Sequence, residues 1–221
     1  MKNPWVMLPL RAPYVLAADA PYVAVFNRAA PKGAAIDTTL MPVPFNGDPK
    51  APVIILALNP GWSPRDGGVH RDATFRRLVR ESLAHQRVIR PFMPLDGDPT
   101  RPGAQWWRRN LKAVLAEVGE DRAAEHICCL EYFPYHSRVF AHATLRLPSQ
   151  EYTFELLRRA LARKAVVVLT RGTRLWMGAV PALASYPLLI CTSNPRSASI
   201  SPRNCGPAFR RIINQLRRAA L

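Results

Sequence analysis

The sequence predicts a single α/β domain built on a central four-stranded parallel sheet with helices on both faces. Short, nearly continuous apolar segments alternate with segments of helical periodicity, which is typical of parallel strands covered on both sides. The length of 221 residues suits one hydrophobic core. We expect one domain over residues 1–221, in which a Pro-rich wrap of short elements, residues 1–50, precedes an α/β core, residues 51–221.

The expected strands share a short apolar run. They are VIILAL (53–58), HICCL (126–130), AVVVLT (165–170) and PLLICT (187–192). The expected helices show apolar residues at helical spacing or a start or stop signal. They are a helix capped by Asp72 with Phe75, Leu78 and Val79 on one face, the segment WWRRNLKAVLAEVG that stops at Gly119, a helix that follows Ser149 and runs to about Arg163, a short helix or turn at 171–178, and a C-terminal helix within 206–220.

Charge is the strongest global feature of the composition. The chain has 31 Lys and Arg against 15 Asp and Glu, a formal net charge of +16 and a pI near 10.8. Arginine greatly outnumbers lysine, and its planar guanidinium suits phosphate recognition. The pattern favours a polyanionic partner, and the alternative is an Arg-biased genome that uses arginine for solubility.

The sequence disfavours an integral membrane protein and a secreted protein. The apolar content is 48%, yet no apolar run approaches the ~20 residues of a membrane span. The N-terminal stretch is broken by Arg11 and prolines, so we expect no signal peptide, a cytoplasmic location and no membrane partner. The four cysteines lack C-x-x-C spacing, so we expect buried thiols and neither a disulfide framework nor a metal site.

Polar and aromatic residues follow all four strands, at the sheet edge where open α/β folds place their ligands. The four segments are Asn59-Pro60-Gly61-Trp62, then 131–136 (EYFPYH), then Arg171-Gly172, then 193–199 (SNPRSAS). The sequence has no G-x-x-x-x-G-K-[ST] or G-x-G-x-x-G motif, so a P-loop or dinucleotide fold is not supported. No G-x-S-x-G elbow holds a serine nucleophile.

The segments LALNPGW and SNPRSAS resemble the two motifs of the uracil-DNA glycosylase superfamily. The likeness is greatest to its mismatch-specific branch, whose first motif ends in Asn-Pro-Gly and whose second begins Asn-Pro-Ser. The motif order, their positions after strands and the aromatic helix WWRRNLKAVL between them also match, and the resemblance covers roughly residues 53–215. It implies an enzyme that flips a nucleotide out of DNA and hydrolyses its glycosidic bond without a cofactor.

The resemblance implies roles for two asparagines. Asn59 lies where the family positions the water that attacks the sugar C1′, and Asn194 where it stabilises the departing base or the water. Fixed amide dipoles at two facing strand ends suit an oxocarbenium-like sugar and an anionic base. The alternative is that Asn59 caps a turn and Asn194 satisfies local backbone, as Asn-Pro pairs commonly do.

Three positions depart from the family pattern. Glu131 stands where an asparagine usually reads the uracil edge, so it either reads the base or pairs with an arginine. Arg196 replaces the serine of the second motif, and Ala198 stands where some members carry an apolar wedge. Ile200 is the candidate for that wedge, unless it packs in the core. The cysteine spacing does not match the iron-sulfur branch, so we expect no cluster.

Further candidates come from the loops. Phe92, Trp62 and Phe133 are candidates for stacking on the base, with Phe92 preferred. His136 and His142 are candidate acids or phosphate contacts. The candidates for DNA contact lie after the fourth strand: Arg196, Ser197, Ser199, Ile200 and Arg203.

These observations favour a monomeric DNA glycosylase that removes uracil or another deaminated base. Two other functions remain open: a non-catalytic DNA- or RNA-binding module with the same basic cleft, and a nucleotide or nucleoside hydrolase. The sequence does not decide which base is excised or whether single- or double-stranded DNA is preferred.

Overall fold

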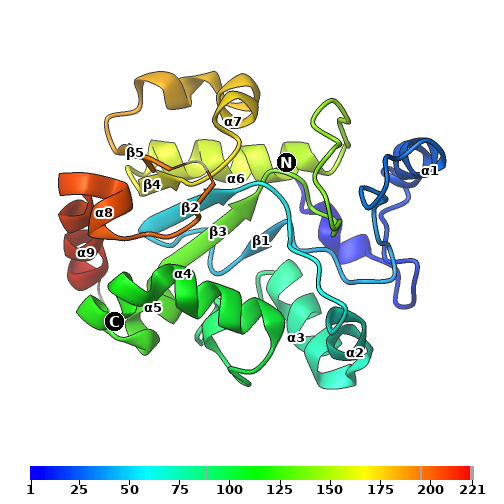
Figure 1. The fold of residues 1–221 in the computed structure, drawn as a ribbon, viewed down its shortest axis with the longest axis horizontal. Helices are drawn as coiled ribbons and strands as arrows, with labels where there is room; N and C mark the ends of the chain where they lie inside the picture. Colours follow the sequence, from blue (N-terminus) through cyan, green and yellow to red (C-terminus); the bar gives the residue numbers. More distant parts are fainter. Residues whose placement is uncertain (88, 195, 220–221) are drawn as a thin grey trace.

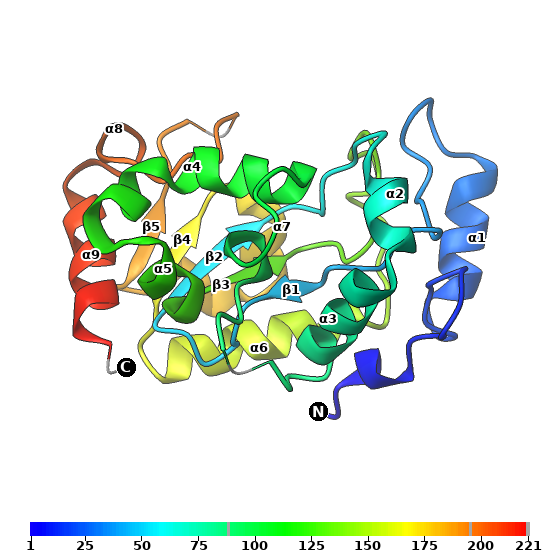
Figure 2. The same cartoon turned by 90° about the horizontal axis from the view of Figure 1, so that it is seen from below.

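A computed structural model describes residues 1–87, 89–194 and 196–219. Five strands form one sheet in the order β1-β3-β2-β4-β5, and all neighbours are parallel except β1 and β3 (Figures 1 and 2). The strands are β1 (Phe45–Asn46), β2 (Val53–Ala57), β3 (Ile127–Glu131), β4 (Val166–Leu169) and β5 (Leu189–Cys191).

The helices precede, separate and follow these strands. They are η1 (Pro4–Met7), α1 (Ala20–Arg28), α2 (Asp66–Arg71), α3 (Ala73–Leu83), η2 (Met93–Leu95), α4 (Pro102–Val118), α5 (Glu120–His126), α6 (Gln150–Ala162), α7 (Thr173–Ala179), η3 (Pro181–Ser185), α8 (Pro202–Cys205), η4 (Gly206–Ala208) and α9 (Phe209–Arg218).

Side chains that alternate along the strands divide the core into two layers. Ile55 and Val168 point to the face covered by α4, α5 and α9, whereas Ile54 and Val167 point to the face covered by α6 and α7 (Figures 1 and 2). The second layer also contains buried residues of the first 50 positions, such as Trp5. Burial on both faces explains why the central strands are apolar except at Glu131, the last residue of β3.

Several local predictions are confirmed. The Asp72 side chain accepts a hydrogen bond from the Phe75 backbone nitrogen at 2.7 Å and so caps α3. Helix α4 ends at Gly119, whose φ of +80° glycine adopts at no steric cost. The C-terminal helix buries one face, including Ile212, as its amphipathic spacing predicts.

The predicted number of strands was wrong, because the sheet has a fifth strand. Strand β1 pairs antiparallel with β3, where Phe45 lies opposite Leu130. Two residues in a Pro-rich segment carry no periodic signal, so this strand forms only because the edge of β3 offers unpaired backbone groups. Next to it, a Cβ on Gly47 would lie 2.3 Å from the Ile127 carbonyl oxygen, so only glycine fits.

The strand order determines where along the carboxyl edge of the sheet a ligand can bind. From β2 the chain crosses to β3 on one side, whereas from β4 it continues to β5 on the other side. The carboxyl ends of β2 and β4 therefore flank a topological switch point, where the diverging loops leave a crevice.

No helix in the described part of the chain is long and apolar enough to cross a membrane. The cysteines are free thiols; Cys128, Cys129 and Cys205 are buried as expected, but Cys191 is exposed at the end of the edge strand β5.

Candidate active site

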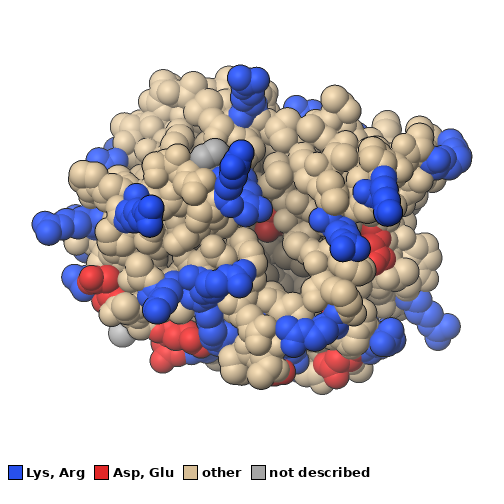
Figure 3. Space-filling model, in the orientation of Figure 1, with Lys and Arg blue, Asp and Glu red and all other residues tan. Residues whose placement is uncertain are grey.

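A cavity of about 760 Å³ opens at the switch point. Its floor is formed by residues at the carboxyl ends of the three central strands, including Ala57, Glu131 and Thr170, and its walls come from α2, α3 and the start of α4. Lys and Arg side chains surround a hollow on the corresponding face (Figure 3). Arg101, Arg138 and Arg171 are among the cationic residues that line the cavity. These cationic side chains suit a ligand that carries negative charge.

Asn59 lies two residues beyond the end of β2 and lines the cavity. Its amide nitrogen donates to the Ser137 hydroxyl and to the Pro60 carbonyl oxygen, both at 3.1 Å. The Oδ1 atom of Asn59 has no hydrogen-bond partner among the described residues. The amide is therefore oriented by its nitrogen, and its oxygen is free to accept a hydrogen bond from water.

Glu131 is the last residue of β3, and its backbone is in register with Ala57 of β2. The side chain is 8% exposed and lines the cavity. Burial raises the pKa of Glu131 to about 8, against the opposing effects of the Cys129 thiol and the charge of Arg171. Glu131 is therefore mostly neutral at pH 7. Its Oε2 atom is buried and has no hydrogen-bond partner in the part of the chain that the structure describes.

His136 fixes the Asn-Pro-Gly loop to the segment after β3. Its Nδ1 lies 2.6 Å from the Gly61 carbonyl oxygen and its Nε2 lies 3.0 Å from the Met41 carbonyl oxygen. Burial lowers the pKa of His136, whereas these two carbonyl groups oppose that effect. His70 packs perpendicular to it at 5.2 Å, and burial lowers the pKa of His70 to about 3, so His70 is a neutral neighbour.

The aromatic candidates separate into one cavity residue and two core residues. Trp62 is 37% exposed, lines the cavity and donates from Nε1 to Asp37 at 3.2 Å. Phe92, the preferred stacking residue, is fully buried and packs edge-to-face on Trp107, and Phe133 is fully buried against His142. Neither of these two phenylalanines offers a ring face to a base, because apolar packing encloses both.

Two other aromatic residues also line the cavity. Phe75 and Trp106 are partly exposed and line the same cavity as Trp62. The Arg101 guanidinium lies 5.3 Å from the centre of the Phe75 ring. Helical spacing placed Phe75 on the apolar face of its helix and made no prediction for Trp106, because periodicity does not distinguish the core from the wall of a cavity.

Asn194 does not face Asn59 across the cavity. It is exposed, it is not among the lining residues, and its Oδ1 accepts from the Arg196 backbone nitrogen at 2.9 Å. The expectation of two asparagines facing one site is corrected accordingly: Asn194 forms a local Asx turn. Pro195, the third residue of the SNPRSAS motif, lies outside the described residues.

Hydrogen bonds of the Asn204 side chain stabilise the loop after β5. The sequence analysis did not identify this residue. Its Oδ1 accepts from the Asn194 nitrogen at 2.9 Å and its Nδ2 donates to the Ser199 carbonyl oxygen at 2.7 Å. The Ser197 hydroxyl accepts from the Ser199 nitrogen at 3.3 Å. Asn204 is 6% exposed, and only its position in the folded loop reveals this role.

Ile200 is a core residue and not a wedge. It is 1% exposed, packs in the layer that contains α4 and α9, and its backbone nitrogen donates to the Asn110 carbonyl oxygen at 2.9 Å. By contrast, Arg196 and Arg203 are exposed and Ser197 and Ser199 are partly exposed, so these four can reach a phosphate. The burial of Ile200 leaves no large apolar side chain in this loop to enter a duplex.

Two further cavity residues lacked a strong sequence signal. Ser137, which orients Asn59, lies in a loop that has no motif, and only the fold brings it to the end of β2. Arg171 was noted only as part of the sheet edge, yet its side chain lines the cavity. Its position directly after a buried strand is the signal that identifies it.

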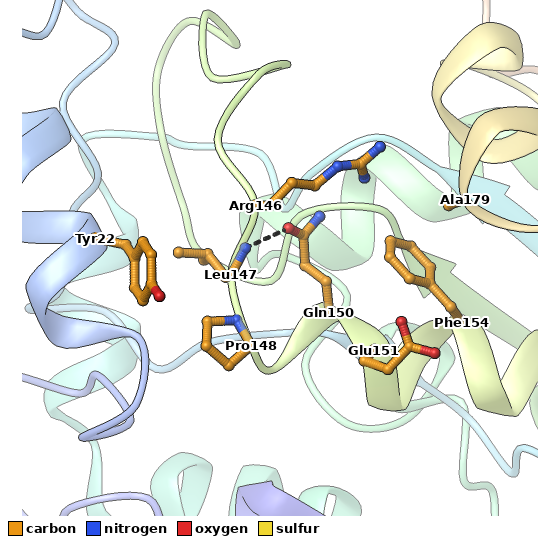
Figure 4. Close-up of a pocket in the computed structure, with 8 residues that line it drawn as sticks. All are labelled: Tyr22, Arg146, Leu147, Pro148, Gln150, Glu151, Phe154 and Ala179. Atoms are coloured by element: carbon orange, nitrogen blue, oxygen red, sulfur yellow. Dashed lines mark hydrogen bonds between the residues drawn. The ribbon is translucent and has the colours of Figure 1, made fainter.

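A second hollow, of about 520 Å³, lies between α1, α6 and α7 (Figure 4). The amide of Gln150 at its centre accepts from the Leu147 nitrogen at 2.9 Å and donates to the Tyr132 carbonyl oxygen at 2.7 Å. Because these polar atoms already have partners within the protein, the first cavity is the stronger candidate site.

Within residues 1–87, 89–194 and 196–219, no cluster of three or more His, Cys, Asp or Glu side chains is arranged to hold a metal ion. Comparison of the chain with protein-family models, with curated proteins and with solved structures found no match.

Proposed function

We propose that this protein is a DNA glycosylase that hydrolyses the N-glycosidic bond of uracil or a related deaminated base. The observation that carries the proposal is that the Asn59 amide and the buried carboxyl group of Glu131, whose pKa burial raises to about 8, line one cavity. The first group suits a water molecule and the second suits the edge of a base.

Hydrolysis of the glycosidic bond needs a positioned water more than a strong acid. The transition state places positive charge on the sugar and negative charge on the base, and preorganised dipoles stabilise both. The Asn59 Oδ1 atom would accept a hydrogen bond from the water and direct the water oxygen to C1′, while Ser137 keeps the amide in place. This role is the one that the resemblance of the Asn-Pro-Gly motif implies for Asn59.

A neutral carboxyl group can read a base that contains both N–H and C=O groups. Its hydroxyl donates to the carbonyl oxygen and its other oxygen accepts from the ring N–H. Burial keeps Glu131 mostly neutral at pH 7, so its carboxyl group suits uracil at the position where the family uses an asparagine.

The surroundings of the cavity favour a substrate base that belongs to a nucleic acid. A base must leave the stack before its glycosidic bond is accessible, and it then stacks on aromatic side chains. Trp62, Phe75 and Trp106 line the cavity as candidates for that stacking. The basic side chains around the opening suit the flanking phosphates (Figure 3).

The decisive experiment is a base-release assay on labelled oligonucleotides that contain uracil, hypoxanthine, xanthine or a T·G mismatch, read by alkaline cleavage. We expect strand cleavage at uracil or another deaminated base with the parent protein and none above background with buffer alone. DNA binding without release would support the binding module instead. Hydrolysis of free nucleosides without release from DNA would support the nucleoside hydrolase.

A further inference from the structure

Trp62 differs from the other two aromatic residues that line the cavity. The Phe75 ring has the Arg101 guanidinium 5.3 Å from its centre. The Trp106 ring packs edge-to-face with the ring of Trp107, at 4.8 Å between centres. No aromatic ring or cation in the described part of the chain stacks on the indole of Trp62, which is 37% exposed. Trp62 therefore keeps ring surface available for a ligand.

Asp37 binds the Trp62 indole from a segment 25 positions earlier in the chain. Its Oδ2 atom accepts from the indole Nε1 at 3.2 Å, and its Oδ1 atom accepts from the Thr39 backbone nitrogen at 2.9 Å and from the Thr39 hydroxyl at 2.6 Å. The Asp37 backbone nitrogen also donates to the carbonyl oxygen of His136 at 2.9 Å, and the His136 ring contacts the carbonyl oxygen of Gly61. The indole and the backbone before it are thus held by two residues that are bonded to each other.

The charge of Asp37 strengthens its contact with the indole. Burial opposes the ionisation of Asp37, but hydrogen bonds from Thr39 and Trp62 outweigh this effect and lower its pKa. Asp37 is therefore a charged acceptor at neutral pH, and an N–H group binds a charged acceptor more strongly than a neutral one. Because the Trp62 side chain is partly exposed, packing does not enclose it, and this hydrogen bond selects one orientation of the ring.

We infer, on the basis of the proposed glycosylase function, that Asp37 is a positioning residue that fixes the plane of the Trp62 indole, on which the extruded base stacks. Asp37 does not line the cavity, so it acts through Trp62. An aromatic side chain that is already held in one orientation loses less freedom when a ligand binds, so the hydrogen bond increases the affinity for the base.

Two single-stranded oligonucleotides measure the contribution of the stacked base. One contains 2′-fluoro-2′-deoxyuridine, whose fluorine destabilises an oxocarbenium-like sugar and so prevents base release. The other contains a tetrahydrofuran abasic site, which has no base. Trp62→Ala should weaken binding of the first oligonucleotide roughly 10–10²-fold, the size of one base–aromatic stack, and leave binding of the second near the parental value. Trp62→Phe keeps an aromatic ring but no N–H group, and should lose less.

A double-mutant cycle tests whether Asp37 acts through Trp62. Asp37→Ala should weaken binding of the uracil analogue several-fold in the parent protein. The same change should have little further effect in Trp62→Phe, because that variant already lacks the hydrogen bond. Asp37→Asn keeps an acceptor oxygen and should recover most of the affinity. A merely structural role of Asp37 would instead lower the affinity for both oligonucleotides in both backgrounds.

Asp98→Ala is the matched control. Asp98 is exposed and does not line the cavity, and its Oδ1 atom accepts from the backbone nitrogen and the hydroxyl of Thr100 at 2.8 and 2.7 Å, as Asp37 does from Thr39. This control should leave both affinities near those of the parent. Losses from Asp37→Ala that are equal for the two oligonucleotides, or that add to those of Trp62→Phe, would overturn the inference. Absence of uracil release by the parent protein would instead refute the proposed hydrolysis and leave the binding comparison intact, so the two failures are distinguishable.

Discussion

The Nδ1 atom of His136 lies 2.6 Å from the carbonyl oxygen of Gly61, a residue 75 positions earlier in the chain. This hydrogen bond joins the loop after β3 to the Asn-Pro-Gly loop after β2 and so limits where Asn59 can lie. The same loop after β3 supplies Ser137, which binds the Asn59 amide directly. Two contacts from one loop therefore position the amide that we propose to orient the water.

We predict that His136 acts as a positioning residue. His136→Ala should lower the single-turnover rate of base release by up to about 10²-fold, because small displacements of a reacting group have effects of that size. DNA affinity should change little, since His136 is buried. His136→Gln, which retains an N–H donor, should recover part of the rate; no difference between the two variants would contradict the role of the hydrogen bond.

Asn59 is predicted to act in the transition state. Asn59→Ala should slow base release by about 10²–10³-fold with DNA affinity near that of the parent, because one preorganised dipole is lost. Single-turnover kinetics together with a binding titration measure both quantities. Asn214→Ala, which changes an exposed asparagine of α9, is the matched control. A parental rate for Asn59→Ala would refute the proposed role.

The raised pKa of Glu131 predicts a pH dependence of activity. The neutral form is present below a pKa of about 8 and is lost as the pH rises through that value. Base release should therefore decline above about pH 8, and Glu131→Gln or Glu131→Asn should flatten this decline. If the pH profiles of parent and variants coincide, Glu131 does not read the base.

The same group predicts a pH dependence of stability. Between its ordinary pKa of 4.5 and the folded value of about 8, Glu131 holds a proton in the folded state and loses it in the unfolded state. The free energy of unfolding should therefore fall as the pH rises across this window, by up to about 1.4 kcal/mol per pH unit. Urea titrations of Glu131→Gln should show a smaller decline than those of the parent protein.

The basic rim predicts salt-dependent DNA binding. Each phosphate contact on duplex DNA contributes a slope of about −0.9 to the plot of log affinity against log salt. Arg138→Ala, at the exposed rim of the cavity, should reduce the slope by about one contact, whereas Arg210→Ala on α9 should not. A flat titration for the parent protein would mean that the net charge of +16 serves another purpose.

Ile200 is predicted to affect stability and not strand opening. Ile200→Ala should lower the free energy of unfolding by about 2–5 kcal/mol, because it leaves a cavity beside α4 and α9. Arg203→Ala, at a nearby exposed position, should change stability by about 0.5 kcal/mol or less. If Ile200→Ala instead loses activity only on double-stranded substrate and keeps its stability, Ile200 acts as a wedge.

The sequence by itself determined the α/β class, the four parallel strands and the placement of Asn59 and Glu131 at one sheet edge. Apolar runs, the Asp72 cap and the Gly119 stop are local signals, because they depend on residues close in the chain. The carboxyl ends of parallel strands necessarily share an edge, so residues that directly follow strands can be assigned to it without a structure.

Only the tertiary structure decided what depends on contacts between distant segments. Strand β1 forms because β3 has a free edge, and Ser137 reaches Asn59 across 78 positions of the chain. Burial separates Phe92 and Ile200, which fill the core, from Trp62, which lines the cavity, although all three are large apolar residues in loops. Composition and spacing indicate which chemistry a side chain offers. Its neighbours in the folded chain determine whether it contacts solvent, a ligand or the core.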